Sequence, residues 1–384
     1  MTNPKRWHSF AVAAGGARKP RDILTLAALK PELRVSAEDL NAHDLLLNTP
    51  SGVVDLEREH EELRPHDPGL LLTQITRVPY VPDAPRPEVW LRTLKTVIPD
   101  DGLRAYFQRV AGYLLSGLTV EQVLFFFHGS GANGKTVVAE TLRWVMGDYA
   151  ASVRSRLLTD RGADDHPTSL DATRDKRGLF CPELPTAARF SEENLKSFTG
   201  GDTLRARKMH QDETEFRPRF KLVICGNSKP RIRGRDDGIW RRMHLVPFDV
   251  KIPLRDRDPR LGQRLQGESE GILRWMVQGF REYRRLGLKP PAVVLDAVQS
   301  YREEQDPVGR FLEERTFESD GAEVSASSLH AGYLDWAARS QETQLTATAF
   351  GRGMRGRGVQ KRKTSGAWFY VGIDLLDPRE DVPF

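Results

Sequence analysis

The chain has 384 residues, with 58 Lys and Arg against 53 Asp and Glu, so its formal net charge is +5. Hydrophobic residues make up 39% and charged residues 29%, which is not polar enough for a disordered chain. The sequence has no run of about 18 apolar residues, which excludes a transmembrane helix. Its two cysteines are too few for a disulfide framework or a four-cysteine zinc site. We therefore expect a cytoplasmic protein of two or three domains with no membrane partner.

The elements expected along the chain divide it into three parts, 1–100, 101–290 and 291–384. The first part has a short helical pattern at 21–29 and a proline-rich stretch, and we expect a mainly helical connecting or collar region. The second part begins with a helical pattern at 102–116. It then alternates helical patterns with apolar runs at 123–127, 179–181, 220–225 and 243–248. This alternation predicts an α/β fold with a central, mainly parallel sheet.

A glycine-rich motif follows the first apolar run directly and fits the pattern G-x-x-x-x-G-K-[ST]. It also opens a helical pattern whose apolar face includes Val138 and Leu142 and which ends at Gly147. This strand–loop–helix order is the one in which backbone N–H groups and a helix N-terminus bind phosphate. Lys135 is expected to contact the β- and γ-phosphates, and Thr136 to hold Mg²⁺. The predicted phosphate-binding residues are Gly129, Ser130, Gly131, Ala132, Asn133, Gly134, Lys135 and Thr136.

Two later apolar runs end in polar residues that suit nucleotide hydrolysis. Glu183 follows the run 179–181 and could order Mg²⁺ and activate water, and Asn227 follows the run 220–225 and could position the same water. Arg241 and Arg242 lie between a tryptophan and the run 243–248, from where an arginine could reach a neighbouring subunit's γ-phosphate. Taken alone, each of these residues is more typical of a turn or of a solvated surface.

Taken together, these motifs resemble the superfamily 3 helicases, in particular the helicase part of phage and plasmid primase–helicase proteins. GSGANGKT is similar to the family's phosphate loop, and CPELP at 181–185 is similar to its Walker B strand. Residues 195–216 resemble the signature that follows, and 221–248 resemble the sensor 1 and arginine-finger block. Upstream, 45–57 resembles the segment that precedes the ATPase in this family.

The resemblance implies an AAA+-like ATPase domain at 101–290, with ATP and Mg²⁺ as cofactors. It also implies a homo-hexameric ring that translocates 3′-to-5′ on single-stranded DNA and unwinds forked DNA during replication of a mobile element. Lys135, Thr136, Glu183 and Asn227 would then act in cis. Arg242, or in second place Arg241, would act in trans. Glu183 lacks the adjacent second acid that many members have.

The resemblance also implies that a hairpin before the run 220–225 enters the ring channel, where it would bind DNA phosphates. Residues 204–207 alternate apolar and basic side chains, as a two-faced strand does, and 211–214 are expected to form a turn. Lys208 and His210 would lie near its tip. The family's full-length proteins carry a primase domain that has no room in this sequence, so we expect a separate primase or polymerase chain as a partner.

The third part is expected to contain two helices at 292–305 and 308–316, followed by a winged-helix DNA-binding domain. From 350 to 373 it has six basic residues and no acid. Within this domain, a second helix capped at 346–348 would present arginines to DNA, and a basic wing would follow it. The candidate DNA contacts are Arg352, Arg355, Lys361, Arg362 and Lys363. Glycines at 351, 353, 356 and 358 count against the helix.

Three functions remain open on the sequence alone. The first is a ring-forming DNA helicase, and the second is an origin-binding initiator that melts DNA without processive unwinding. The third is a regulatory ATP switch acting on a protein partner. RNA unwinding also stays open, because phosphate contacts do not read the sugar.

Overall fold

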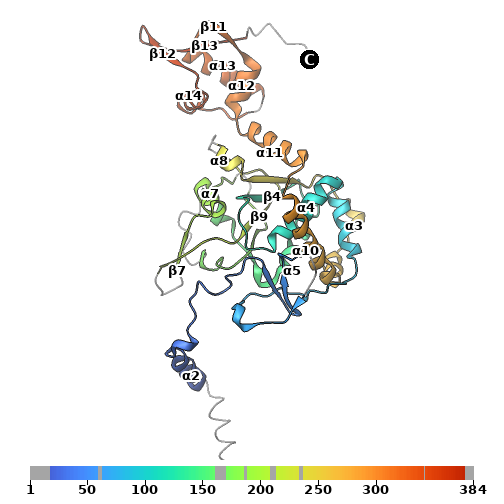
Figure 1. Ribbon diagram of the computed structural model, residues 1–384. Helices are drawn as coiled ribbons and strands as arrows, with labels where there is room; N and C mark the ends of the chain where they lie inside the picture. Colours follow the sequence, from blue (N-terminus) through green and yellow to red (C-terminus); the bar gives the residue numbers. More distant parts are fainter. Residues whose placement is uncertain are drawn as a thin grey trace, which may run out of the picture.

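A five-stranded parallel sheet forms the centre of the molecule (Figure 1). The computed structural model describes residues 18–58, 63–160, 170–185, 188–207, 213–232, 237–340 and 342–376. The strand order is β10-β4-β9-β6-β5, and every neighbouring pair is parallel. The strands are β4 (Leu124–His128), β5 (Ala150–Ser152), β6 (Gly178–Cys181), β9 (Lys221–Gly226) and β10 (Met243–Pro247). The four predicted apolar runs are confirmed as strands, whereas the short strand β5 was not foreseen.

Alternate residues of the strands enter two separate hydrophobic cores, one on each face of the sheet. Phe125 and Phe127 of β4 lie in the first core, and Leu124 and Phe126 lie in the second. The first core is covered by α3 (Glu88–Val97), α4 (Asp101–Leu114), α5 (Lys135–Met146), α9 (Leu261–Gly267) and α10 (Ser269–Leu286). The second is covered by α7 (Glu192–Gly200) and α8 (Asp237–Trp240). Burial on both faces explains why the strands are continuous apolar runs.

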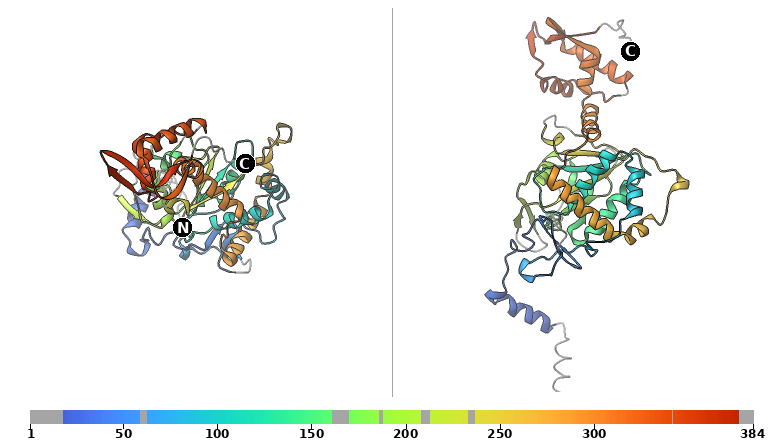
Figure 2. Two further views of the ribbon diagram at one scale, coloured as in Figure 1. Left: turned by 90° about the horizontal axis from the view of Figure 1, so that it is seen from above. Right: turned by 45° about the vertical axis from the view of Figure 1, so that its right-hand side comes forward.

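The segment before the α/β unit is less helical than expected. It contains an antiparallel sheet made of β1 (Leu46–Thr49), β2 (Gly52–Asp55) and β3 (Leu63–Arg64), which corrects the mainly α prediction. This segment is joined to the central sheet by the buried Arg177, whose guanidinium donates to the carbonyls of Leu115 and Leu46 at 2.6 and 2.8 Å. Helix α2 (Arg18–Ala28) stands away from the body in both side views (Figures 1 and 2).

A third unit follows the long helix α11 (Ala292–Glu304), which contacts β10. It comprises α12 (Pro307–Arg315), β11 (Thr316–Ser325), α13 (Ala326–Arg339), α14 (Ala347–Arg355), β12 (Lys361–Thr364) and β13 (Ala367–Leu375). Its strands form an antiparallel sheet in the order β11-β13-β12, and its helices share a separate core. The remaining elements are the hairpin of β7 (Leu204–Arg207) and β8 (Glu213–Phe216) and short 3-10 turns at Pro31–Leu33, Pro68–Leu70, Gly147–Tyr149, Ser155–Leu158 and Leu254–Asp256.

A partly buried histidine links the first core to the sheet and makes stability depend on pH. His244 of β10 lies with its Nδ1 2.6 Å from the hydroxyl of Tyr106 on α4, and burial lowers the pKa of His244 to about 4. An unfolded histidine titrates near 6.5, so between about pH 4 and 6.5 the unfolded state binds more protons than the folded state. Acidification through this window therefore destabilises the fold.

We expect His244→Gln to reduce this pH dependence. The loss of unfolding free energy between pH 7 and pH 5 should be smaller in the variant by about 2 kcal/mol. The reason is that only the unfolded wild type protonates this histidine over the roughly 1.5 pH units between its ordinary pKa near 6.5 and pH 5. Urea unfolding at both pH values measures this difference. The exposed His43 provides the control, since His43→Gln should lose as much stability as the wild type. Equal losses in all three proteins would contradict the role of His244.

Candidate functional site at the carboxyl edge of the sheet

The carboxyl ends of the parallel strands bring the predicted hydrolytic residues to one edge. The glycine-rich loop (residues 129–134) leaves the end of β4, Asn227 follows β9, and Glu183 follows β6 in the next strand position. This is the edge at which ligands bind in open parallel sheets. The exposed Asp249, just beyond β10, lies on the same edge and was not singled out from the sequence.

The backbone of the glycine-rich loop requires its glycines. Gly131 and Gly134 have φ values of +95° and +80°, and a Cβ on Gly129 would lie 2.2 Å from the carbonyl oxygen of Phe248. The side chain of Asn133 donates to that same carbonyl at 2.8 Å, which fixes the loop to the end of β10. The loop leads into α5, which starts at Lys135 and has no acidic residue in its first turn. A helix N-terminus of this kind favours an anion.

Lys135 occupies the centre of the site. Its side chain is almost fully buried, and Nζ donates to the carbonyl of Gly129 at 3.1 Å and to Oδ1 of Asn227. Burial lowers the pKa of Lys135, while the nearby Cys225 and Glu183 raise it. Lys135 and Asn227, which stand 92 positions apart in the chain, are thus joined by a direct hydrogen bond. An ammonium held by neutral carbonyl oxygens can exchange these partners for phosphate oxygens.

Thr136 and Glu183 have the chemistry that a magnesium ion requires. The Thr136 side chain is exposed at the start of α5, and Glu183 is exposed just after β6, close enough to Lys135 to influence its pKa. Hydroxyl and carboxylate oxygens suit Mg²⁺, which keeps several waters and takes few protein ligands. The described residues contain no cluster of three or more His, Cys, Asp and Glu that could hold a metal by itself.

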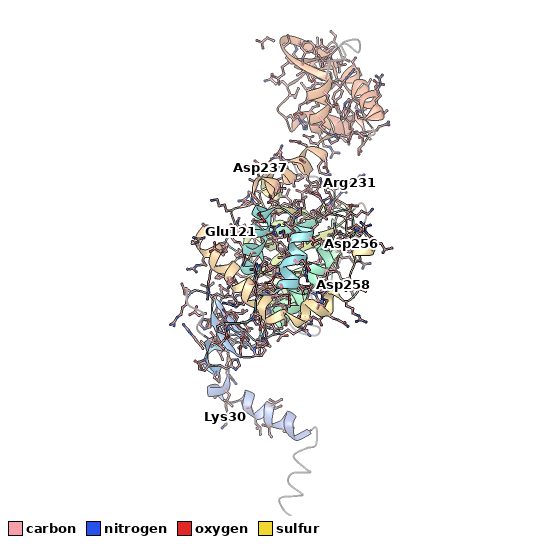
Figure 3. All side chains as sticks on the ribbon, turned by 90° about the vertical axis from the view of Figure 1, so that its right-hand side faces the viewer. Lys30, Glu121, Arg231, Asp237, Asp256 and Asp258 are labelled. Atoms are coloured by element: carbon pink, nitrogen blue, oxygen red, sulfur yellow. The ribbon has the colours of Figure 1, made fainter. Side chains whose placement is uncertain are left out.

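A largely apolar pocket of about 600 Å³ opens beside the glycine-rich loop. Ala132 and Gly134 form one wall, Val97 of α3 forms another, and Ile252 and Pro253 form a third. The Ile252 N–H donates to the carbonyl of Ala132 at 2.8 Å, so the third wall is tied to the loop. Asp256 and Asp258, labelled in Figure 3, also line the pocket. Sequence reasoning missed this pocket because its walls come from separate segments, none of which has a recognisable motif.

The two candidate arginines lie at the opposite edge of the sheet. They precede β10, and the backbone carbonyl of Arg242 accepts from Leu124 N–H, at the start of β4 rather than at its end. Arg242 donates from Nη1 to the carbonyl of Gly238 at 2.5 Å, whereas the Arg241 side chain is exposed. A strand of five residues spans roughly 16 Å, so neither arginine reaches the glycine-rich loop of its own chain.

The predicted hairpin is confirmed in its strands and corrected in its turn. Leu204 and Ala206 of β7 are buried, and Arg205 and Arg207 are exposed, as the alternation predicts. Strand β8 already begins at Glu213, so the prediction that Glu213 and Thr214 belong to the turn is wrong. Glu213 and Thr214 are polar, but they pair with Arg207 and Ala206 of β7, and this pairing makes them part of β8. Lys208 and His210 lie outside the described residues.

In the C-terminal unit the basic residues occupy α14 and β12. The helix forms in spite of its glycines, because Thr346 caps it and Phe350 and Met354 enter the core. Arg352 and Arg355 are exposed on α14. Lys361, Arg362 and Lys363 all belong to strand β12, and Ser365 and Gly366 form the turn that joins this strand to β13.

The basic side chains of the C-terminal unit differ in their partners. Arg362 forms an ion pair with Glu323 of β11, and Arg357 forms one with Asp306, which precedes α12. Lys361 and Lys363 instead lie over aromatic rings of β13. Four of the five candidate DNA contacts are therefore exposed without an ion pair to an acid in the part of the chain that the structure describes.

The central parallel sheet and the glycine-rich strand-to-helix loop are consistent with a P-loop-like α/β unit. Residues 3–99 match the family described as D5 N terminal like, and residues 127–242 match a family described as of unknown function (DUF5906). A candidate helicase of Acanthamoeba polyphaga mimivirus is 28% identical over 78% of this chain and 33% of its own length. A candidate primase of African swine fever virus is 26% identical over the same shares.

The C-terminal region of NrS-1 shares the fold, with a TM-score of 0.50, 13% identity and 77% of each chain covered. These findings confirm the resemblance drawn from the sequence, because the chain carries a D5 N terminal like segment and is similar to viral proteins named as helicases and primases. It spans about a third of the length of the curated relatives that it matches. No helix among the described residues is long and apolar enough to cross a membrane.

Proposed function

We propose that this chain is the motor of an ATP-dependent DNA helicase of the superfamily 3 type, with an AAA+-like ATPase unit and ATP and Mg²⁺ at the carboxyl edge of the sheet. The observation that carries the proposal is the contact of Lys135 with Asn227, which joins the glycine-rich loop to the end of the neighbouring strand. The relatives named as helicase and primase support the choice of DNA as the substrate.

In this proposal each residue at the carboxyl edge of the sheet has its own role in binding or hydrolysing the nucleotide. The loop N–H groups and the start of α5 bind the phosphates, and Lys135 leaves the Gly129 carbonyl to neutralise charge on the β- and γ-phosphates. Thr136 and Glu183 would hold Mg²⁺, which would supply positive charge to the phosphates when bound. Asn227 orients the attacking water, and the apolar pocket beside the loop receives the base.

The arrangement of the chain also supports assembly into a ring, for which we propose a hexamer. Arg241 and Arg242 stand at the edge opposite the glycine-rich loop, where only another subunit's nucleotide is within reach. Helix α2 exposes Ile23, Leu24 and Leu26 while standing away from the body (Figure 2), as a helix covered by another copy does.

Two parts of the chain are proposed to contact DNA. The β7–β8 hairpin would enter the ring channel, with Arg205 and Arg207 on its exposed face. The C-terminal unit would act as a winged-helix module, which the order of its three helices and three strands supports. Its helix α14 is the counterpart of a recognition helix, and the β12–β13 hairpin is the counterpart of a wing.

ATP-dependent separation of a forked DNA duplex tests this proposal. An origin-melting initiator remains the second candidate, because the basic C-terminal unit suits binding of an origin duplex. It would hydrolyse ATP and open an origin without displacing strands processively. A switch acting on a protein partner would hydrolyse ATP at the same rate with and without DNA.

A further inference from the structure

The β12–β13 hairpin presents a tryptophan among lysines on one of its faces. In the antiparallel register Lys363 is opposite Trp368 and Lys361 is opposite Tyr370, and directly paired residues share a face. The Lys361 ammonium lies 5.2 Å from the ring centroids of both Trp368 and Tyr370, and that of Lys363 lies 5.9 Å from Trp368. We call these four residues the Lys–Trp face.

The core of the unit does not use Trp368. Tyr370 is buried in that core and anchors the base of the hairpin, whereas the Trp368 side chain is 48% exposed. The tight turn at Ser365 and Gly366, with φ values of +48° and +86°, fixes the register and places Trp368 two residues from the tip. An indole held rigidly outside the core is a binding feature rather than a packing one, because an exposed tryptophan loses the free energy of burial.

The Lys–Trp face continues onto α14. The charge of Arg355 acts on the Tyr370 hydroxyl, and a Cβ on Gly351 would lie 3.6 Å from that hydroxyl. Arg355 is exposed, so its cation extends the positive face of the hairpin onto the helix. Arg362 points to the other side of the hairpin, where it pairs with Glu323. In Figure 1 the hairpin projects from the edge of the C-terminal unit.

The surroundings of the indole indicate a nucleic acid rather than an apolar protein surface. A protein partner covering Trp368 would remove the two lysine ammonium groups from water without supplying anions, which is costly. A nucleotide supplies both components, a flat base for the indole and phosphates for the ammonium groups. A base can stack on a side chain only where its face is free, in a single strand or at the end of a duplex.

We propose that Trp368 stacks on an unpaired base of DNA while Lys361 and Lys363 bind the flanking phosphates. This inference rests on the proposed function in taking DNA as the substrate. The proposal places the hairpin on the single-stranded arm of a fork. A wing that binds only duplex phosphates would use the lysines and would have no role for the exposed tryptophan. Stacking is tolerant of base identity, so the hairpin grips any sequence.

The test compares Trp368→Ala and Trp368→Phe in the full chain without nucleotide. Fluorescence anisotropy measures the affinity for a labelled single strand and for a blunt duplex of equal length. Loss of one stacked base weakens single-strand binding by about 5- to 100-fold, with duplex binding unchanged. Trp368→Phe should recover most of the affinity. Phe317→Ala is the matched control, because Phe317 is a 44% exposed aromatic on β11 of the same unit. Unchanged thermal midpoints exclude misfolding.

A second measurement covers the case in which another DNA site dominates the affinity. Photocrosslinking of a single strand containing 5-iodouracil, followed by mass spectrometry, should label Trp368. Unchanged affinity in Trp368→Ala together with no label at Trp368 would overturn the proposal. ATP hydrolysis without DNA is measured on the same proteins, so a failure of stacking with hydrolysis intact leaves the proposed motor standing. A wild type that binds no single strand contradicts both proposals.

Discussion

Lys135→Ala should reduce ATP hydrolysis by about 10²- to 10³-fold, the usual cost of removing one well-placed charge donor at a reacting group. The buried ammonium now spans the Gly129 carbonyl and Asn227, so its loss removes both the phosphate contact and the link between the glycine-rich loop and β9. Release of phosphate from ATP at saturating nucleotide measures the effect.

The matched control for this variant is Lys229→Ala. Lys229 lies two residues beyond Asn227 at the same edge, but its ammonium pairs with Glu304 at 2.5 Å and lies over the ring of Tyr301. We expect Lys229→Ala to retain most of the hydrolysis. If Lys135→Ala hydrolysed ATP as fast as the wild type, the assignment of the site would be wrong.

Arg242→Ala should lower hydrolysis by about 10³-fold in the assembled protein, in the range that a finger arginine contributes. The expected cause is loss of a charge supplied to the neighbouring subunit's nucleotide, since β4 separates Arg242 from its own glycine-rich loop. Nucleotide binding, measured by equilibrium titration, should stay near the wild-type value.

Mixing two inactive variants gives the decisive comparison. In a mixed ring, a Lys135→Ala subunit offers an intact Arg242 to the intact site of an Arg242→Ala subunit, so hydrolysis should partly return. If mixing restored nothing although the oligomers exchanged subunits, action in trans would be refuted. The same experiment with Arg241→Ala decides between the two arginines, because only loss of the arginine that acts in trans should be rescued by mixing. The two differ in their surroundings, since Arg241 is exposed while Arg242 donates to the Gly238 carbonyl.

The sequence predicted those parts of the fold whose signals are local. The apolar runs became β4, β6, β9 and β10, because strands buried on both faces need continuous apolar residues. The helix after the glycine-rich loop and the capped helix α14 also formed as predicted. Strand β5 and the sheet of β1, β2 and β3 were missed, because short strands of mixed composition depend on their partners rather than on their own pattern.

The site divides in the same way. Lys135, Glu183 and Asn227 were found because each follows a recognisable strand, and the parallel sheet brings those strand ends together. The pocket beside the loop was not predictable, since Val97 and Ile252 meet only through tertiary packing. Likewise, no sequence pattern distinguishes Lys363, which lies over Trp368, from its neighbour Arg362, which pairs with Glu323.

Strand displacement on a forked DNA duplex, with ATP and Mg²⁺, tests whether this chain is the motor of a DNA helicase. One strand carries a fluorophore and its complement a quencher, and the wild type is compared with Lys135→Ala. We expect ATP-dependent separation by the wild type and none by the variant, and varying the two tails then gives the polarity. DNA-stimulated hydrolysis without strand separation would contradict the helicase and favour the initiator.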